Sequence, residues 1–232
     1  MTHAGHNHRI WGEGGLLRHC SGHELPKVGG PLLYFLIRFV AKLGEQVERE
    51  DRLFLVDTSA SMAERVGPDH SRKIDIVKRG LKQFCLEHWP EMYYDRPLRV
   101  GIVIFRQTGL PATPYFEQLV PLFPTPPVLE VYRIDEIKVR GSSPLYEALK
   151  YASTVMRGST RPVRRVKLIG DGDNDGPDPM KEVDQVAAEG IRVDCVEVSE
   201  EASKLMTEVA ARTGGKHSLV DTSRDIRKAL EE

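Results

Sequence analysis

The chain has 232 residues, of which 40% are hydrophobic and 29% charged, and this composition excludes disordered, collagen-like and polytopic membrane proteins. The chain has 33 Lys and Arg residues and 34 Asp and Glu residues, so its net charge is −1. Because dedicated nucleic-acid binders carry an excess of basic residues, we expect no nucleic-acid partner. The three cysteines, Cys20, Cys85 and Cys195, are odd in number and widely spaced. They predict free thiols in a reducing, cytoplasmic setting rather than a disulfide framework.

The first fifty residues differ in character from the rest of the chain. Residues 1–30 are rich in Gly and His, lack the apolar region of a signal peptide, and are expected to form a loosely ordered tail. Residues 31–43 are apolar but include Arg38 and are too short to cross about 30 Å of hydrocarbon, so we expect no membrane span. Apolar residues at helical spacing predict an amphipathic helix over 31–50 that packs on the domain: Leu32, Leu36, Phe39, Leu43 and Val47.

From residue 51 to residue 232, short apolar runs alternate with helical patterns. Continuous apolar strands between amphipathic helices are typical of parallel sheets covered on both faces. We therefore predict an α/β fold: a doubly wound, mainly parallel sheet flanked by helices on both faces, with one antiparallel edge strand. The predicted strands cover 53–56, 98–105, 116–122 (antiparallel), 166–169, 193–198 and 217–220, and the predicted helices cover 73–88, 144–156, 180–189, 202–211 and 223–230.

Oxygen-bearing side chains gather where the strands of such a sheet end, which is where ligands bind in doubly wound folds. Asp57, Ser59 and Ser61 follow the first strand, and their alternate spacing places them on one side of an extended turn. Asp171 follows the strand over 166–169, and a Gly-Ser-Ser-Pro-Leu segment opens the helix over 144–156. Two carboxylates with several hydroxyls, and no histidine or thiolate, suit a hard cation such as Mg²⁺.

The motifs Asp-x-Ser-x-Ser over 57–61, Gly-Ser-Ser-Pro-Leu over 141–145 and Leu-Ile-Gly-Asp-Gly over 168–172, in this order, resemble the metal-ion-dependent adhesion site of von Willebrand factor type A domains. The resemblance covers residues 51–232 and implies a Rossmann-like type A fold. Ser143 stands where the family has threonine, and Gly170 where it often has threonine or serine. By this resemblance the ligands of Mg²⁺, with Mn²⁺ or Ca²⁺ as alternatives, are Asp57, Ser59, Ser61, Ser143 and Asp171.

The resemblance implies a binding module rather than an enzyme. An open position on the metal would take a Glu or Asp carboxylate of a protein partner. Two alternatives stay open: a Mg²⁺-dependent hydrolase or phosphatase using the same pocket, and a purely structural interaction domain. A hydrolase needs a general base beside the metal, and the sequence offers no clear one. It also lacks the phosphate-binding, dinucleotide-binding and nucleophile-elbow motifs.

Several of these residues have other interpretations. Ser143 precedes Pro144 and could serve as a helix N-cap. Residues 171–176 with Glu182 satisfy the EF-hand calcium pattern, but an EF-hand loop follows a helix, whereas this one follows a predicted strand. Asp173 and Asp175 are instead candidates for a weaker second cation site or an acidic rim. The basic run over 161–165 favours a solvated loop over a nucleic-acid patch.

Overall fold

The computed structural model describes residues 48–93, 97–109, 113–122 and 131–232. The chain separates into two compact units, Met1–Gln46 and Val47–Glu232, and every described residue belongs to the second. The predicted tail and most of the predicted helix over 31–50 lie outside the described residues. The last three residues of that prediction are not helical, because Glu48 and Arg49 are irregular and Glu50 begins a strand.

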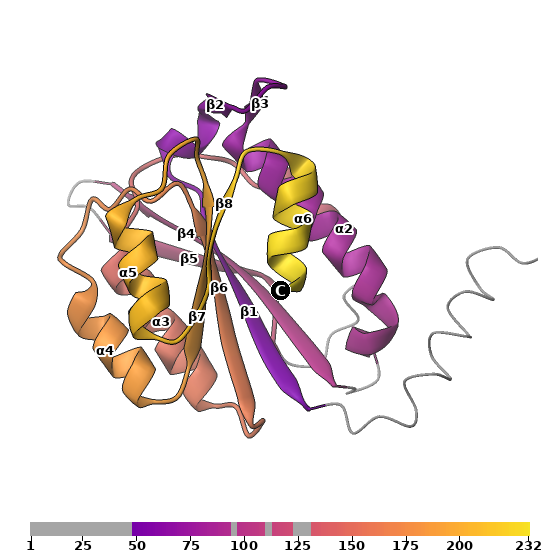
Figure 1. Cartoon of the computed structure of the whole chain (residues 1–232), viewed down its shortest axis with the longest axis vertical. Helices are drawn as coiled ribbons and strands as arrows, with labels where there is room; N and C mark the ends of the chain where they lie inside the picture. The colour runs from indigo at the N-terminus through magenta and orange to yellow at the C-terminus, as the bar shows by residue number, and fades with distance from the viewer. Residues whose placement is uncertain (1–47, 94–96, 110–112, 123–130) are drawn as a thin grey trace, which may run out of the picture. The chain divides into compact units, whose positions relative to one another are not determined.

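The second unit is built on a six-stranded sheet with the strand order β5-β4-β1-β6-β7-β8 (Figure 1). β1 pairs in parallel with β4 on one side and β6 on the other, and β7 and β8 continue the parallel arrangement. β5 pairs antiparallel with β4 at the edge, so the predicted doubly wound sheet with one antiparallel edge strand is confirmed. The strands are β1 (Glu50–Asp57), β4 (Leu98–Thr108), β5 (Thr113–Val120), β6 (Val163–Gly170), β7 (Arg192–Val198) and β8 (His217–Val220).

Helices cover both faces of the sheet (Figure 1). α2 (Lys73–Tyr93) and α6 (Ser223–Glu231) pack on one face, and α3 (Leu145–Arg157), α4 (Met180–Ala188) and α5 (Lys204–Arg212) pack on the other. Among the helices that the structure describes, none has both the length and the apolar character needed to cross a bilayer.

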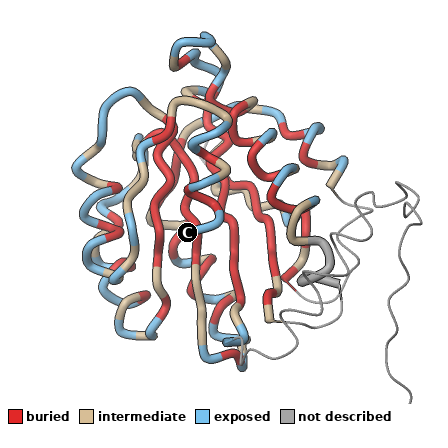
Figure 2. The backbone as a smooth tube through the Cα atoms, turned by 45° about the vertical axis from the view of Figure 1, so that its right-hand side comes forward, coloured by how far each residue is buried: buried red, intermediate tan, exposed pale blue. Residues whose placement is uncertain are grey.

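The apolar run of β1 is continuous because both of its sides are buried. Leu53 and Leu55 belong to the cluster under α3, α4 and α5, whereas Phe54 and Val56 belong to the cluster under α2 and α6. All four side chains are at most 1% exposed. Figure 2 shows the same concentration of buried residues along the central strands, with exposed residues on the outer sides of the helices. A strand buried on both faces shows no polar alternation, which is why its sequence predicts a parallel sheet.

The connection between β1 and α2 holds a feature that no periodic pattern predicts. After the short 3-10 helix η1 (Ala60–Ala63), β2 (Arg65–Val66) and β3 (Ser71–Arg72) form a two-stranded antiparallel hairpin. The amide of Lys73 donates to the carbonyl of Glu64 at 2.9 Å, and this bond closes the base of the hairpin. The hairpin thereby delivers the first residue of α2 to the carboxyl end of the sheet.

The basic run over 161–165 is not a solvated loop, so that interpretation is wrong. Arg161 is 7% exposed, pairs with Asp51 at 3.3 Å and donates to the carbonyl of Glu50 at 3.0 Å. Arg165 pairs with Glu50 and Asp194 at 3.7 and 3.5 Å. These arginines are buried or half-buried because carboxylates neutralise them at the amino ends of the strands.

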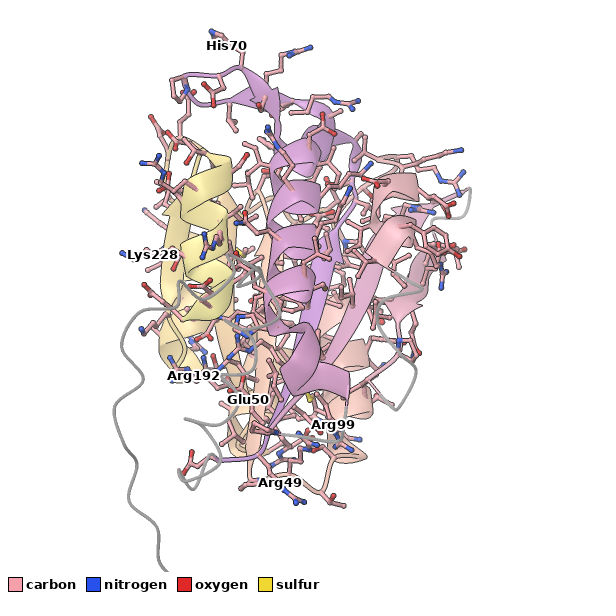
Figure 3. All side chains as sticks on the ribbon, turned by 90° about the vertical axis from the view of Figure 1, so that its right-hand side faces the viewer. Arg49, Glu50, His70, Arg99, Arg192 and Lys228 are labelled. Carbon is pink, nitrogen blue, oxygen red and sulfur yellow. The ribbon has the colours of Figure 1, made fainter. Side chains whose placement is uncertain are left out.

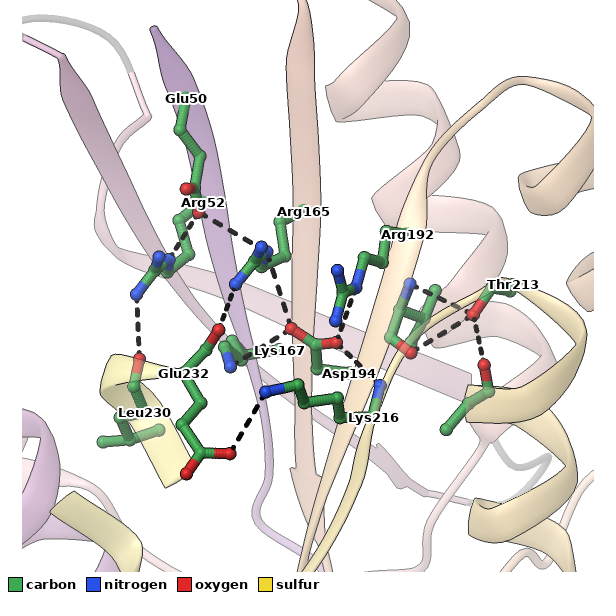
Figure 4. Close-up of polar contacts among 12 residues, drawn as sticks. Glu50, Arg52, Arg165, Lys167, Arg192, Asp194, Thr213, Lys216, Leu230 and Glu232 are labelled. Atoms are coloured by element: carbon green, nitrogen blue, oxygen red, sulfur yellow. Dashed lines mark hydrogen bonds and ion pairs between the residues drawn. The ribbon is translucent and has the colours of Figure 1, made fainter. Parts of the chain in front are cut away.

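Charged side chains form a network around these arginines, at the end of the sheet opposite the hairpin. Figure 3 places Glu50, Arg99 and Arg192 near this end and His70 at the other. Figure 4 shows Lys167 and Arg165 converging on Asp194. The candidate functional residues lie at the carboxyl ends of the strands, which is the end of the sheet opposite this charged network.

Candidate metal-binding site

The two predicted carboxylate ligands lie at the ends of neighbouring strands. Asp57 is the last residue of β1, and Asp171 directly follows β6. Because β1 and β6 pair in parallel, with Val56 opposite Ile169, these ends meet at the same edge of the sheet. Burial raises the pKa of Asp57 to about 7, with a smaller contribution from the charge of Asp171. The site therefore disfavours the charged form of Asp57, chiefly because the carboxylate is removed from water.

The two serine hydroxyls of the 57–61 motif converge beside Asp57. The Ser59 amide donates to Asp57 Oδ1 at 2.7 Å and turns the chain directly after the strand. Ser61 lies in η1, so the extended turn predicted from the alternate spacing is replaced by a 3-10 turn. The hydroxyl oxygens of Ser59 and Ser61 are nevertheless 3.0 Å apart and hydrogen-bond each other. The motif thus brings three oxygen donors together, as predicted, through a different backbone shape.

Ser143 reaches the same edge on a loop fixed by backbone contacts. Gln107 and Ser142 exchange two backbone hydrogen bonds of 2.8 and 3.1 Å. Gly141 has a φ of +76°, and a Cβ there would lie 2.0 Å from the carbonyl oxygen of Gln107, so a side chain does not fit. The loop places Ser143 beside Asp57, where its hydroxyl opposes the rise in the Asp57 pKa without reaching hydrogen-bonding geometry.

The alternative role of Ser143 as a helix N-cap is wrong. α3 begins at Leu145, its N-cap position is Pro144, and no side chain at that position caps it. Asn174 caps the helix instead, because its Oδ1 accepts from the amide of Leu145 at 3.2 Å. The Ser143 hydroxyl is buried and, among the described residues, has no hydrogen-bond partner. A buried hydroxyl without a partner is costly, which makes it a candidate ligand.

The acidic loop after Asp171 does not form an EF-hand. Asp175 Oδ2 accepts from the amide of Ser143 at 3.0 Å, and the amide of Asp175 donates to the carbonyl of Ser143 at 2.9 Å. Glu182 lies buried on α4, where its hydrogen bond raises the pKa of Tyr146. Asp175 therefore braces the Ser143 loop. Asp173 is exposed, and partial desolvation of its carboxylate together with the charge of Asp171 raises its pKa. Its role in an acidic rim or a second cation site stays a prediction.

Lys73 is a part of the site that the sequence analysis missed. Its Nζ donates to Asp171 Oδ2 at 3.0 Å and to Glu64 Oε2 at 2.7 Å. The hairpin between β1 and α2 carries Lys73 to this position, and two-residue strands leave no periodic signal from which to predict it. A fixed ammonium group therefore partly neutralises Asp171, and only one carboxylate oxygen of Asp171 is engaged.

Two of the predicted ligands carry buried oxygen atoms without a partner. Across the described residues, five buried side-chain nitrogen or oxygen atoms lack a hydrogen-bond partner, and Ser143 Oγ and Asp171 Oδ1 are two of them. Both lie beside Asp57, which interacts electrostatically with each residue. Buried polar atoms are normally satisfied, so these two oxygens are candidates to contact a ligand. The donor set of carboxylates and hydroxyls fits a hard divalent cation.

Comparison with solved structures identifies the fold. The chain superimposes on the conserved hypothetical protein BatB from Bacteroides thetaiotaomicron with a TM-score of 0.55 and 18% identity, covering 79% of this chain and 100% of that one. It superimposes on a von Willebrand factor type A protein from Catenulispora acidiphila with a TM-score of 0.56 and 14% identity, covering 78% of this chain and 41% of that one. The chain has a von Willebrand factor type A-like fold.

The same type A-like fold occurs in the pilus adhesin SpaC from Lactobacillus rhamnosus GG, at a TM-score of 0.60 and 12% identity, over 81% of this chain and 30% of the adhesin. No family profile and no curated protein matches the chain. The resemblance predicted from the three motifs is therefore confirmed for the fold. In this type A-like domain no group of three or more His, Cys, Asp or Glu side chains is placed to hold a metal within the described residues. The candidate site combines two carboxylates with serine hydroxyls.

Proposed function

We propose that this type A-like domain is a Mg²⁺-dependent protein-binding module. The residues that would hold the ion are Asp57, Ser59, Ser61, Ser143 and Asp171, and a Glu or Asp carboxylate of a protein partner would complete its coordination. The observation that carries the proposal is the pair of buried, unpartnered oxygens, Ser143 Oγ and Asp171 Oδ1, beside the desolvated Asp57 carboxylate.

The donor chemistry explains why an external carboxylate would be captured. Only two of the five proposed ligands are carboxylates, so they would at most balance the two positive charges of the ion, and the neutral hydroxyl ligands would leave it electrophilic toward an external carboxylate. Mg²⁺ prefers oxygen ligands and keeps exchangeable positions when a protein supplies few carboxylates. Mn²⁺ and Ca²⁺ accept the same oxygen donors and are the alternative ions.

We propose binding rather than hydrolysis because the basic group nearest the site does not suit general-base catalysis. Burial acts to lower the pKa of Lys73, but its hydrogen bonds and charge interactions with Glu64 and Asp171 outweigh burial and raise that pKa. Lys73 is therefore protonated at neutral pH and does not accept a proton from water.

Within the second unit, Cys85 and Cys195 are buried free thiols, which supports the proposal of a cytoplasmic location.

The double substitution Ser59→Ala/Ser61→Ala tests this function. The two hydroxyls hydrogen-bond each other, so removing both together does not leave one of them unpaired. The melting temperature of the metal-free variant should therefore stay within a few degrees of wild type. Calorimetric titration with Mg²⁺ and Mn²⁺ should show one site in wild type and none in the variant. The control is Ser218→Ala/Ser223→Ala, which alters two half-buried serines of β8 and α6 and should bind metal normally. Unchanged metal binding by the Ser59/Ser61 variant would contradict the ligand assignment.

A further inference from the structure

A second pocket lies next to the candidate metal site, on the side of the antiparallel edge strand. It has a volume of about 570 Å³ and is formed by β4, β5, the 3-10 helix η3 (Val131–Glu136) and the segment that follows this helix. Its walls include the basic side chains Arg106, Arg133, Lys138 and Arg140. Two carboxylates also line it, so basic groups outnumber acidic ones by four to two.

Arg106 is the buried element of this pocket. Its side chain is on a residue only 4% exposed, and its guanidinium stacks on the ring of Tyr115 at 4.1 Å from the centroid. Nη1 donates to Thr58 Oγ1 at 3.3 Å and to the carbonyl of Lys138 at 3.4 Å. Nε is buried and has no partner among the described residues. Burial and the charge of Arg140 lower the pKa of Arg106, and the charge of Glu117 opposes this shift only in part.

The two acidic residues of the pocket, Glu117 and Glu136, can neutralise only part of the charge of its four basic residues. Glu117 is already bound by Arg133, at 3.0 Å, and by the hydroxyl of Tyr115, at 2.7 Å. Lys138 and Arg140 are exposed, and within the described residues no ion pair or hydrogen bond engages the side chain of either. The pocket thus presents uncompensated positive charge, and such charge in a concave site attracts anions.

One chain segment links this pocket to the metal site. The amide of Arg140 donates to the carbonyl of Thr58 at 2.8 Å, and the amide of Ala60 donates to the carbonyl of Gly141, in the same segment as Arg140, at 2.9 Å. Three residues after Arg140, the segment supplies Ser143, the proposed ligand. Because Thr58 directly follows Asp57 and also receives a hydrogen bond from Arg106, the two sites share a wall.

We propose that this cationic pocket binds a second acidic side chain of the same protein partner, beside the carboxylate captured at the metal site. The partner would then present an acidic segment rather than a lone carboxylate. This inference rests on the proposed function, since it places the pocket next to a carboxylate-binding metal. Guanidinium groups recognise carboxylates through paired hydrogen bonds, and Arg106 and Arg140 supply two such groups.

The test measures binding of two fluorescein-labelled probes by anisotropy, in Mg²⁺ and in EDTA. One probe is octaglutamate, and the other is a Gly/Ser peptide of the same length with a single Glu. The variant is Lys138→Gln/Arg140→Gln, which removes two exposed charges and leaves the proposed ligands intact. The matched control is Arg224→Gln/Lys228→Gln, which removes one Arg and one Lys from the exposed side of α6.

In Mg²⁺, octaglutamate should bind wild type and the control equally and the Lys138/Arg140 variant about tenfold more weakly. The single-Glu probe should bind all three proteins alike. Equal octaglutamate affinity for the variant and the control would overturn the inference. So would displacement of octaglutamate by equimolar inorganic phosphate, because the pocket would then select phosphate. Calorimetry with Mn²⁺ on the same proteins separates the two proposals. If wild type binds no Mn²⁺, the proposed function is contradicted. If all three proteins bind Mn²⁺ and the Lys138/Arg140 variant binds octaglutamate as tightly as wild type, only the pocket proposal is contradicted.

Discussion

Lys73 and Asp171 form a buried ion pair beside the candidate metal ligands. Nζ of Lys73 lies 3.0 Å from Oδ2 of Asp171, and the two side chains are 9% and 1% exposed. The other oxygen of Asp171 has no partner among the described residues. The ammonium group therefore compensates part of the negative charge in the metal-free protein. It also places a positive charge where a divalent cation would bind, and so opposes binding of that cation.

The substitution Lys73→Met should weaken the metal-free protein and strengthen metal binding. Removing one member of a buried pair leaves the Asp171 charge uncompensated, at a cost of about 3 kcal/mol in the free energy of unfolding. The same change removes repulsion toward Mg²⁺, so the stabilisation by added Mg²⁺ should exceed that of wild type. Urea unfolding with and without Mg²⁺ measures both effects.

The control for Lys73 is Lys82→Met, on the same helix. Lys82 forms an exposed pair with Asp135 at 2.8 Å, and exposed pairs contribute less than about 1 kcal/mol. This variant should behave like wild type in both conditions. A Lys73→Met protein that gains no more from Mg²⁺ than the control would show that Lys73 does not act on the metal site.

The sequence predicts the parts of this structure that depend on local patterns. The apolar run of β1 and the spacing of Asp57, Ser59 and Ser61 are local patterns. The structure places the run in the centre of the sheet and the three polar residues at the carboxyl end of its strand. Lys73 was not predicted, because it reaches Asp171 only through the short β2–β3 hairpin, 98 residues away in sequence.

Charge patterns were the least predictive feature. The arginines over 161–165 look like a solvated run, yet Arg161 is buried against Asp51 because strands distant in sequence bring their amino ends together. In the same way, Arg106 lies in β4, directly after the apolar part of the strand, and the sequence gives no sign that it stacks on Tyr115 in a pocket. Composition records the number of charges, whereas their partners depend on topology.

Ser143→Ala should separate metal binding from stability. The Ser143 hydroxyl has no partner in the described structure, so its removal should change the free energy of unfolding of the metal-free protein by no more than about 0.5 kcal/mol. Mg²⁺ affinity should fall, because one proposed ligand is lost. Calorimetry and urea unfolding in EDTA measure the two quantities.

Ser153→Ala is the matched control, since Ser153 is also buried but has partners. Its hydroxyl donates to Glu189 at 2.8 Å and accepts from Arg157 at 3.0 Å. This variant should lose about 1 kcal/mol of stability and keep normal Mg²⁺ affinity. If the two serine variants lose equal stability and equal affinity, Ser143 is a structural residue and not a ligand.

Gly141→Ala should damage the site through the backbone. The positive φ of Gly141 and the 2.0 Å approach to the Gln107 carbonyl leave no room for a methyl group, so the loop must move. We expect a loss of about 1–3 kcal/mol in stability together with weaker Mg²⁺ binding, because Ser143 follows in the same loop. Gly158→Ala is the control: Gly158 has a φ of −71° and only an ordinary contact at 3.5 Å, so both quantities should stay near wild type. Normal metal binding by Gly141→Ala would show that the site does not depend on this loop.

Lys167→Met should change how stability depends on pH. Lys167 is 1% exposed, and burial lowers its pKa from 10.5 to about 8, although Asp194 at 3.1 Å opposes the shift. Between pH 8 and pH 10.5, Lys167 is protonated in the unfolded chain but has released its proton in the folded protein, so the free energy of unfolding rises with pH. Below about pH 8 Lys167 is protonated in both states and does not make stability depend on pH. The free energy of unfolding of wild type, relative to Lys167→Met, should therefore rise by up to about 3 kcal/mol from pH 8 to 10.5. Urea unfolding across this range measures the difference, with Lys204→Met, which removes an exposed lysine of α5, as the control that should show no such rise. A difference that stays flat across the range would mean that the buried ammonium keeps its ordinary affinity for a proton and that Asp194 compensates it fully.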